Sequence, residues 1–110
     1  MATSYKVLGQ AVSVAGTEVT LYTVPAGTET VISSITVCNR DVAGTAYRIA
    51  VRPNGATLEN KHYVAYDIAL DRNSTQAPKL GITLDAGDVI TVRASSANVS
   101  FNAYGSEITA

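Results

Sequence analysis

The sequence is poor in the residues that supply metal and redox chemistry. Among its 110 residues there is one cysteine, one histidine and no tryptophan. One cysteine cannot close a disulfide within the chain, and Cys38 with His62 alone provides too few groups for a zinc site or a cysteine–histidine catalytic centre. We therefore expect no metal and no other cofactor, and we interpret Cys38 as a small hydrophobic residue of a strand.

Charge and long hydrophobic runs are also scarce. Charged residues make up 15% of the chain, whereas about 25% is usual in globular domains. The net charge is -1 and basic residues do not cluster, so nucleic acid is not expected as a partner. No run approaches the roughly 18 apolar residues of a membrane span, and the start of the chain lacks a secretory signal. We expect a protein that folds in a cytoplasm and does not insert into membranes.

Motifs that signal catalysis are missing too. The 8 glycines are scattered singly among turns, without the phosphate-loop or dinucleotide pattern, and there is no Gly-x-Ser-x-Gly elbow. We expect no catalytic residues and no enzyme activity. The enzymatic alternative is a small hydrolase or isomerase on a jelly-roll scaffold, with His62 and Asp67 as its acid–base pair. Asp85 and Asp88 could bind calcium, but carboxylates that flank Ala-Gly in a turn are expected simply because Asp stabilises turns.

Alternating apolar and polar residues dominate what is present, and no helical period is evident. This pattern, rich in β-branched residues, predicts strands at 5–8, 19–24, 31–39, 47–52, 63–70, 79–84, 89–93 and 99–104. Eight short strands separated by turns are typical of an all-β fold with two antiparallel sheets. We predict a single β-sandwich domain over residues 1–110, with jelly-roll or related Greek-key topology.

The turns between these strands are well marked. Pro and Gly at 25–27 predict a tight turn that closes a hairpin between 19–24 and 31–39. Pro53, Asn54 and Gly55 predict a second turn, because Asn-Gly readily adopts positive φ. Residues 56–62 are predicted to form a loop that tolerates a helical turn.

The faces of two strands follow from the alternation. One face of 31–39 is predicted to hold Val31, Ser33, Ile35 and Val37. In 47–52 the predicted inward residues are Ile49 and Val51, and the predicted outward residues are Arg48 and Arg52.

Several strands carry apolar or aromatic residues on both faces. Tyr22 and Val24 alternate with Val19 and Leu21, and Tyr63 and Tyr66 lie in a similar strand. A two-layer sandwich buries only one face of each sheet, and excess apolar surface on a small protein usually marks a protein contact. Tyr22, Val24, Tyr63 and Tyr66 are therefore candidate interface residues, for self-association or for docking onto a larger assembly.

Two neighbouring segments resemble a known family. Residues 21–28 (LYTVPAGT) and 31–39 (VISSITVCN) are similar to a recurring segment in small β-sandwich structural proteins of tailed bacteriophages. The likeness extends to short virion proteins of aquatic and cyanobacterial phages at 47–53, 61–67, 80–84, 87–92, 98–101 and 105–108. The resemblance covers nearly the whole chain and implies a non-enzymatic component of the virion, with no catalytic residues to carry over.

Composition and resemblance together favour a capsid decoration or cement protein. We expect a homotrimer or other homo-oligomer that is assembled in the host cytoplasm and contacts major capsid or tail proteins through strand faces and termini. The alternative is a receptor- or glycan-binding module of the tail or a fibre. Such a module would bind its ligand with loop residues Arg52, Asn54 and His62, beside Tyr63.

Overall fold

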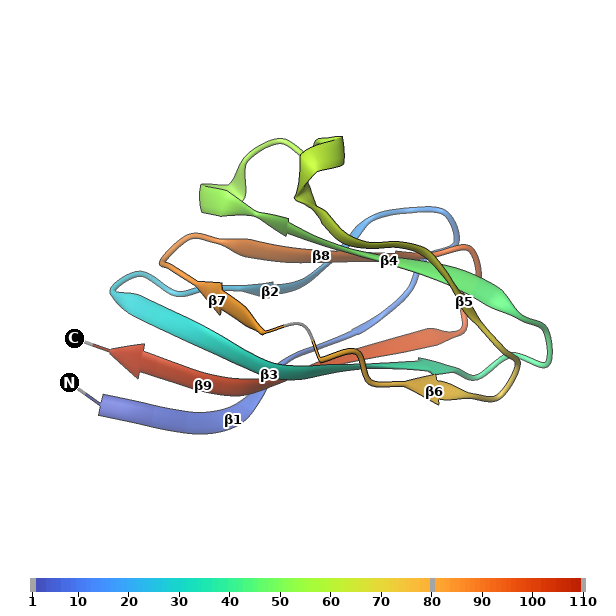
Figure 1. The fold of residues 1–110 in the computed structure, drawn as a ribbon, viewed down its shortest axis with the longest axis horizontal. Helices are drawn as coiled ribbons and strands as arrows, with labels where there is room; N and C mark the ends of the chain where they lie inside the picture. Colours follow the sequence, from blue (N-terminus) through green and yellow to red (C-terminus); the bar gives the residue numbers. More distant parts are fainter. Residues whose placement is uncertain (1, 80, 110) are drawn as a thin grey trace.

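The computed structural model describes residues 2–79 and 81–109. Within these ranges no helix is long and apolar enough to cross a membrane. Two antiparallel sheets pack face to face (Figure 1). The first sheet contains, in order, β1 (Ala2–Val12), β9 (Val99–Thr109), β3 (Thr28–Asn39) and, both paired with β3, β6 (Thr75–Gln76) and β7 (Ile82–Leu84). The second sheet contains β2 (Val19–Thr23), β8 (Val89–Ala94), β4 (Thr45–Arg52) and β5 (Tyr63–Leu70).

The strand order is that of a jelly roll. β6 and β7 pair with opposite ends of β3, on the side away from β9, so together they fill one strand position. β6 and β7 follow each other within the first sheet, and β4 and β5 follow each other within the second. Each of the other connections carries the chain from one sheet to the other. The predicted all-β sandwich is confirmed. The strand predicted at 79–84 is observed from Ile82 to Leu84, and Leu80 lies outside the described residues.

The predicted hairpin at 25–27 is wrong. β2 and β3 lie in different sheets, so the turn carries the chain from one sheet to the other. The strand-end backbone pairs instead with the turn at 85–88: the Val24 N–H donates to the Asp88 carbonyl at 3.0 Å, and the Gly87 N–H donates to the Val24 carbonyl at 3.0 Å. Two turns of similar sequence therefore lie side by side at one end of the sandwich.

The hairpin within one sheet is the one between β4 and β5. Its connection contains two short turns of 3-10 helix, η1 (Pro53–Gly55) and η2 (Asn60–His62), and stands above the second sheet in Figure 1. Asn54 and Gly55 have φ values of 52° and 68°. The predicted positive φ and the helical turn near residue 60 are both confirmed.

The core lies between the two sheets. Its fully buried side chains include Tyr47, Ile49 and Ile90 from the second sheet and Val37 and Phe101 from the first. The rings of Tyr47 and Phe101 meet edge to face, with centroids 6.5 Å apart, an arrangement that aromatic quadrupoles favour. The predicted inward direction of Ile49 is confirmed.

β-bulges change which residues face the core. The register of β3 shifts between Ile32 and Ser34. Ile32 and Ile35 are therefore both buried, and Val31 is exposed, because the extra residue reverses the alternation. The prediction that Val31 and Ser33 share a face with Ile35 is wrong for this reason.

Candidate assembly and binding surfaces

The outer face of the first sheet is almost free of charge. Phe101 and Ala103 are buried in the core, so the residues between them and their cross-strand partners point outward. Among the described residues of β1, β9, β3, β6 and β7, the side chains on this face are Thr3, Tyr5, Val7, Gln10, Val12, Glu29, Val31, Ser34, Thr36, Cys38, Thr75, Thr83, Ser100, Asn102, Tyr104, Ser106 and Ile108. Glu29 is the charged residue in this described set, and it lies at one end. We name this surface the uncharged face.

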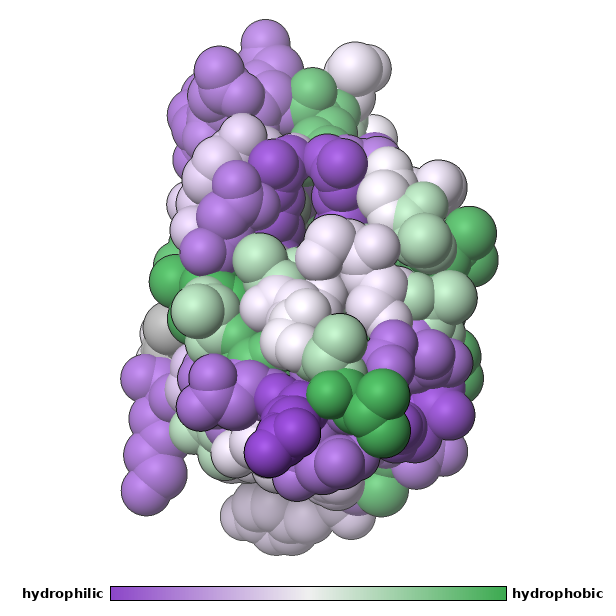
Figure 2. All heavy atoms as spheres, turned by 90° about the vertical axis from the view of Figure 1, so that its right-hand side faces the viewer, coloured by the Kyte–Doolittle hydropathy of each residue, from purple (hydrophilic) through white to green (hydrophobic). Residues whose placement is uncertain are grey.

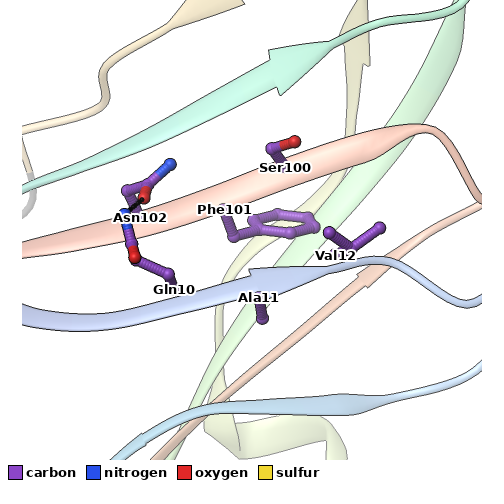
Figure 3. A pocket seen from close by; sticks show the side chains of 6 residues that line it. All are labelled: Gln10, Ala11, Val12, Ser100, Phe101 and Asn102. Atoms are coloured by element: carbon purple, nitrogen blue, oxygen red, sulfur yellow. Dashed lines mark hydrogen bonds between the residues drawn. The ribbon is translucent and has the colours of Figure 1, made fainter.

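A hollow lies on the uncharged face between β1 and β9. Its volume is about 440 Å³, and it is lined by Gln10, Ala11, Val12, Ser100, Phe101 and Asn102. Figure 3 shows the Gln10 and Asn102 side chains meeting on one side of it, where Gln10 Nε2 donates to Asn102 Oδ1 at 2.7 Å. The hollow therefore has polar amide groups on one side and the Val12 side chain on the other.

β1 is the edge of the first sheet and carries exposed apolar side chains. Tyr5 is 84% exposed and Val12 is 55% exposed. β1 pairs with β9 along one side and with no second strand of its sheet among the described residues. A long edge with exposed apolar residues is a site at which proteins associate.

The outer face of the second sheet is charged. Arg48 donates to Asp67 through both Nε (2.6 Å to Oδ1) and a terminal nitrogen (3.3 Å to Oδ2). Beside it, Arg93 pairs with Glu18 at 3.7 Å. The Arg48 guanidinium holds the pKa of the Asp67 carboxyl below its usual range. We name this surface the charged face.

Aromatic rings gather on the charged face at β5. The Arg48 guanidinium carbon lies 4.0 Å from the centre of the Tyr66 ring, within the range of a cation–π contact. Tyr63 and Tyr66 meet edge to face, with centroids 4.9 Å apart. With Asn60 they line a hollow of about 400 Å³. Asp67 beside them has a φ of 51°, an uncommon conformation for a residue other than glycine.

Of the four predicted interface residues, two are exposed and two are buried. Tyr63 is partly exposed and Tyr66 is 53% exposed on the charged face, so both remain candidates. Tyr22 and Val24 are buried in the core, with Tyr22 only 7% exposed. A register shift between Thr20 and Tyr22 explains this, because the bulge turns both Leu21 and Tyr22 inward. The expectation that Tyr22 and Val24 lie on a free strand face is corrected.

The three loop residues predicted to bind a ligand hold the β4–β5 connection in place. Arg52 donates from Nε to Thr91 Oγ1 at 3.1 Å and from a terminal nitrogen to the Ala56 carbonyl at 3.0 Å. The Asn54 N–H donates to Asp88 Oδ1 at 2.8 Å. His62 is buried, and its Nδ1 accepts the Glu59 N–H at 2.9 Å. His62 is therefore a buried residue of the connection and is not exposed to bind a ligand from solution.

The acidic residues singled out in the sequence also have local partners. Asp67 binds Arg48, and no hydrogen bond joins it to His62 among the described residues. The two carboxylate oxygens of Asp88 accept the N–H groups of Asn54 and Asp85, which is how Asp stabilises turns. In the part of the chain that the structure describes, no group of three or more His, Cys, Asp or Glu residues could hold a metal ion.

Sequence reasoning missed Tyr5, Val7 and Tyr104 of the uncharged face. Tyr5 and Val7 lie on alternate positions of β1, which was expected to cover only residues 5–8. Tyr104 follows the buried Ala103. The alternation of the two terminal strands contained the signal, but it identifies the outer face only after β1 and β9 are known to pair.

One end of the sandwich, the right-hand end in Figure 1, offers a less continuous surface. Viewed end-on, hydrophobic residues form small groups separated by hydrophilic ones (Figure 2). The extended outer faces of the two sheets are therefore the better candidates for a large contact.

Comparisons with known proteins bear on the fold. No protein-family model matches the chain, and no curated protein matches it. Over 97% of its length the chain is similar to a chain in the structure of infectious bursal disease virus Gx strain, with 16% identity and a TM-score of 0.54. The present chain corresponds to 32% of the length of the viral chain. This likeness shows a shared fold.

Two further solved structures are similar to the chain at lower TM-scores. Both are of a pentameric capsid protein isolated from metagenomic phage sequences. The first has 21% identity over 92% of this chain and 61% of its own, with a TM-score of 0.41. The second has 20% identity over 92% of this chain and 65% of its own, with a TM-score of 0.34.

Proposed function

We propose that this chain is a structural protein of a bacteriophage virion, without enzymatic activity, that decorates or cements the capsid. The observation that carries the proposal is the uncharged face on a jelly-roll sandwich. Jelly rolls recur in viral capsid domains, and a broad face with little charge and several tyrosine and valine side chains has the composition of a protein contact. The same face supports assembly into a homo-oligomer, and we propose that the oligomer contacts major capsid or tail proteins through its other strand faces and its termini.

The fold is also compatible with a protein that must stay folded outside a cell. The core is continuous between the two packed sheets. A continuous packed core of this kind limits local opening. Because fold alone does not determine function, the proposal depends on finding the protein in particles.

Quantitative mass spectrometry of purified virions tests this function. The copy number is measured relative to the major capsid protein. A number comparable with that of the capsid subunit supports decoration or cementing over the whole lattice. A much smaller number overturns the lattice-wide role in favour of the tail, a fibre or a single vertex. Absence from particles overturns the virion proposal.

A second candidate function is a receptor- or glycan-binding module of the tail or a fibre. The observation that favours it is the hollow beside Asn60, Tyr63 and Tyr66. Aromatic rings next to fixed polar groups are typical of ligand sites, and Arg48 and Asp67 supply both donors and acceptors there. This site replaces the loop of Arg52, Asn54 and His62 as the candidate location.

A glycan array and a host adsorption assay test the second candidate. Binding that is lost in Tyr66→Ala and retained in Tyr5→Ala would support it, because Tyr5 lies on the opposite face. Silence on the array together with unchanged adsorption after removal of the protein would overturn it.

A further inference from the structure

The two outer faces of the sandwich provide an internal comparison. The charged face presents Arg48, Asp67 and Arg93 near its middle, and the β4–β5 connection stands above part of it (Figure 1). The uncharged face has neither feature among the residues that the structure describes. Solvated faces of sheets usually carry charge, whereas the centres of protein interfaces are depleted of Lys, Asp and Glu and enriched in Tyr. Exposed apolar residues occur on both faces, among them Tyr66 on the charged face, so the low charge is what makes the uncharged face the better candidate for a covered surface.

Charges of opposite sign mark the two ends of the uncharged face. Glu29 is exposed near the start of β3. Arg40 directly follows the end of β3, and its Nε donates to Ser100 Oγ at 3.0 Å, so its guanidinium lies beside the outward residues of β9. From Glu29 to Arg40 the extended chain spans roughly 36 Å. A second copy with its strands reversed would place its Arg40 over Glu29 and its Glu29 over Arg40.

An exposed tyrosine and a hollow also lie on opposite sides of the middle of this face. Tyr5 pairs with Ser106, and the hollow lies around the pairs Gln10–Asn102 and Val12–Ser100. Tyr104 lies between these positions, in the strand at the centre of the face. Reversal of the strands about an axis near Tyr104 would bring Tyr5 of one copy over the hollow of the other.

We propose that two copies of this chain pack face to face through their uncharged faces, about a two-fold axis near Tyr104 that reverses the strand direction. This inference rests on the proposed self-assembly and names its surface and partner. The strands of this face contain 11 residues in β1, 11 in β9 and 12 in β3, with 2 in β6 and 3 in β7 at the fourth position. At about 3.3 Å per residue and about 4.8 Å between strands, they form a face of roughly 600 Å². Two such faces bury roughly 1,200 Å², the lower end of the range for specific protein interfaces. The occupant is a second copy, because the end charges and the Tyr5–hollow arrangement are self-complementary.

Sedimentation equilibrium with two matched variants tests the surface. Tyr104→Lys places like charges near the axis, and Val64→Lys introduces the same side chain at an exposed position of β5 in the other sheet. The expected result is a dimer for the unmodified protein and for Val64→Lys, with dimerisation weakened about 30-fold or more in Tyr104→Lys. Circular dichroism and thermal unfolding check that both variants fold.

Three results would overturn the inference. Equal association of Tyr104→Lys and the unmodified protein would exclude this face but leave self-assembly intact. A trimer would exclude the two-fold axis. A monomer would exclude the contact altogether, and the copy number in virions would then decide separately whether the chain is a virion protein.

Cys38 allows a test on the unmodified protein, independent of whether any variant folds. It is the single cysteine of the chain, it pairs with Ser100 and its side chain is partly exposed on the uncharged face. The maleimide labelling rate of Cys38 should fall about tenfold as the protein concentration rises through the dimerisation range, since a population about 90% dimeric leaves one free face in ten. A rate independent of concentration in a protein that dimerises would overturn the proposed surface.

Charge reversal tests the strand direction. Glu29→Arg alone and Arg40→Glu alone should each weaken dimerisation about 2- to 5-fold, the range for exposed ion pairs. The double variant should return close to the unmodified protein, because each new Arg then faces a new Glu. A double variant weaker than either single variant would overturn the reversed orientation.

Discussion

At the scale of single residues, a buried polar network joins the two sheets. Tyr22 of β2 donates its hydroxyl hydrogen to Glu107 Oε2 at 2.5 Å and lies 2.8 Å from Thr30 Oγ1. Lys6 Nζ is 2.6 Å from Glu107 Oε1. Burial, and then the hydrogen bond to Glu107, raise the pKa of Tyr22 to about 12. Lys6, and then Tyr22, hold the pKa of Glu107 below its usual range. A tyrosine that sequence alone assigned to an interface is thus part of the core.

Tyr22→Phe should lower the free energy of unfolding by about 1–3 kcal/mol, because it leaves the buried Glu107 and Thr30 oxygens short of a partner. Urea denaturation followed by circular dichroism measures the change. Tyr66→Phe is the matched control: its ring is exposed and keeps the Arg48 contact, so its effect should stay within about 0.5 kcal/mol. Equal effects for both variants would contradict the role assigned to the Tyr22 hydroxyl.

The Glu107 network should also make stability depend on pH in the acid range. The pKa of Glu107 is lower in the folded protein than in the unfolded chain. Its contribution to stability is therefore complete above the unfolded pKa of about 4.3 and is lost as the pH falls through the lower folded pKa. Glu107→Gln should be less stable at neutral pH and should lose less stability than the unmodified protein between pH 5 and pH 2. Parallel urea midpoints for the two proteins across that range would refute the assignment.

At the scale of strands, the sequence predicts where strands lie, but bulges prevent it from predicting which residues face the core. The positions of β2, β4, β5 and β8 follow from alternation and turn residues, because both are local properties. The faces of β2 and β3 do not, since each contains a register shift. Each shift is set by the neighbouring strand, which the local alternation does not identify. The same limitation led to the choice of Tyr22 as an interface residue. The β4–β5 pairing contains register shifts as well, and there Tyr66 is exposed.

Gly105 is a test of the close strand contact next to the β3 bulge. A Cβ on this residue would collide with the carbonyl oxygen of Val31, which belongs to the paired backbone of β3 and cannot move freely. Gly105→Ala should therefore cost about 3 kcal/mol, the upper part of the usual range for overpacking. At Gly44 a Cβ would lie 3.6 Å from the Leu70 carbonyl oxygen, so Gly44→Ala should change stability little. Thermal unfolding of both variants measures the difference, and a stable Gly105→Ala would contradict the contact.

At the scale of the whole molecule, the sequence predicts the class of fold better than the path of the chain. Eight strand segments sufficed for the sandwich, because two packed sheets are the way for such segments to bury their apolar residues. The turn at 25–27 was predicted correctly, but whether it joins paired strands or crosses between sheets depends on the partners of β2 and β3, which are β8 and β9. The apolar residues on both faces of several strands predicted self-association. The surface that we propose for it, on β1, β9 and β3, could be named only from the jelly-roll pairing.

The distribution of charge over the whole molecule gives a last prediction. If copies associate through the uncharged face, only the pairs between Glu29 and Arg40 at its rim respond to salt, and exposed pairs are screened with modest effect. The dimer Kd should therefore change by less than about threefold between 50 and 500 mM NaCl. Association through the charged face would respond more to salt, since the Arg48–Asp67 and Arg93–Glu18 ion pairs lie there and would enter the contact. Sedimentation equilibrium at the two salt concentrations measures the Kd, and a change of more than about tenfold would exclude the uncharged face as the main contact.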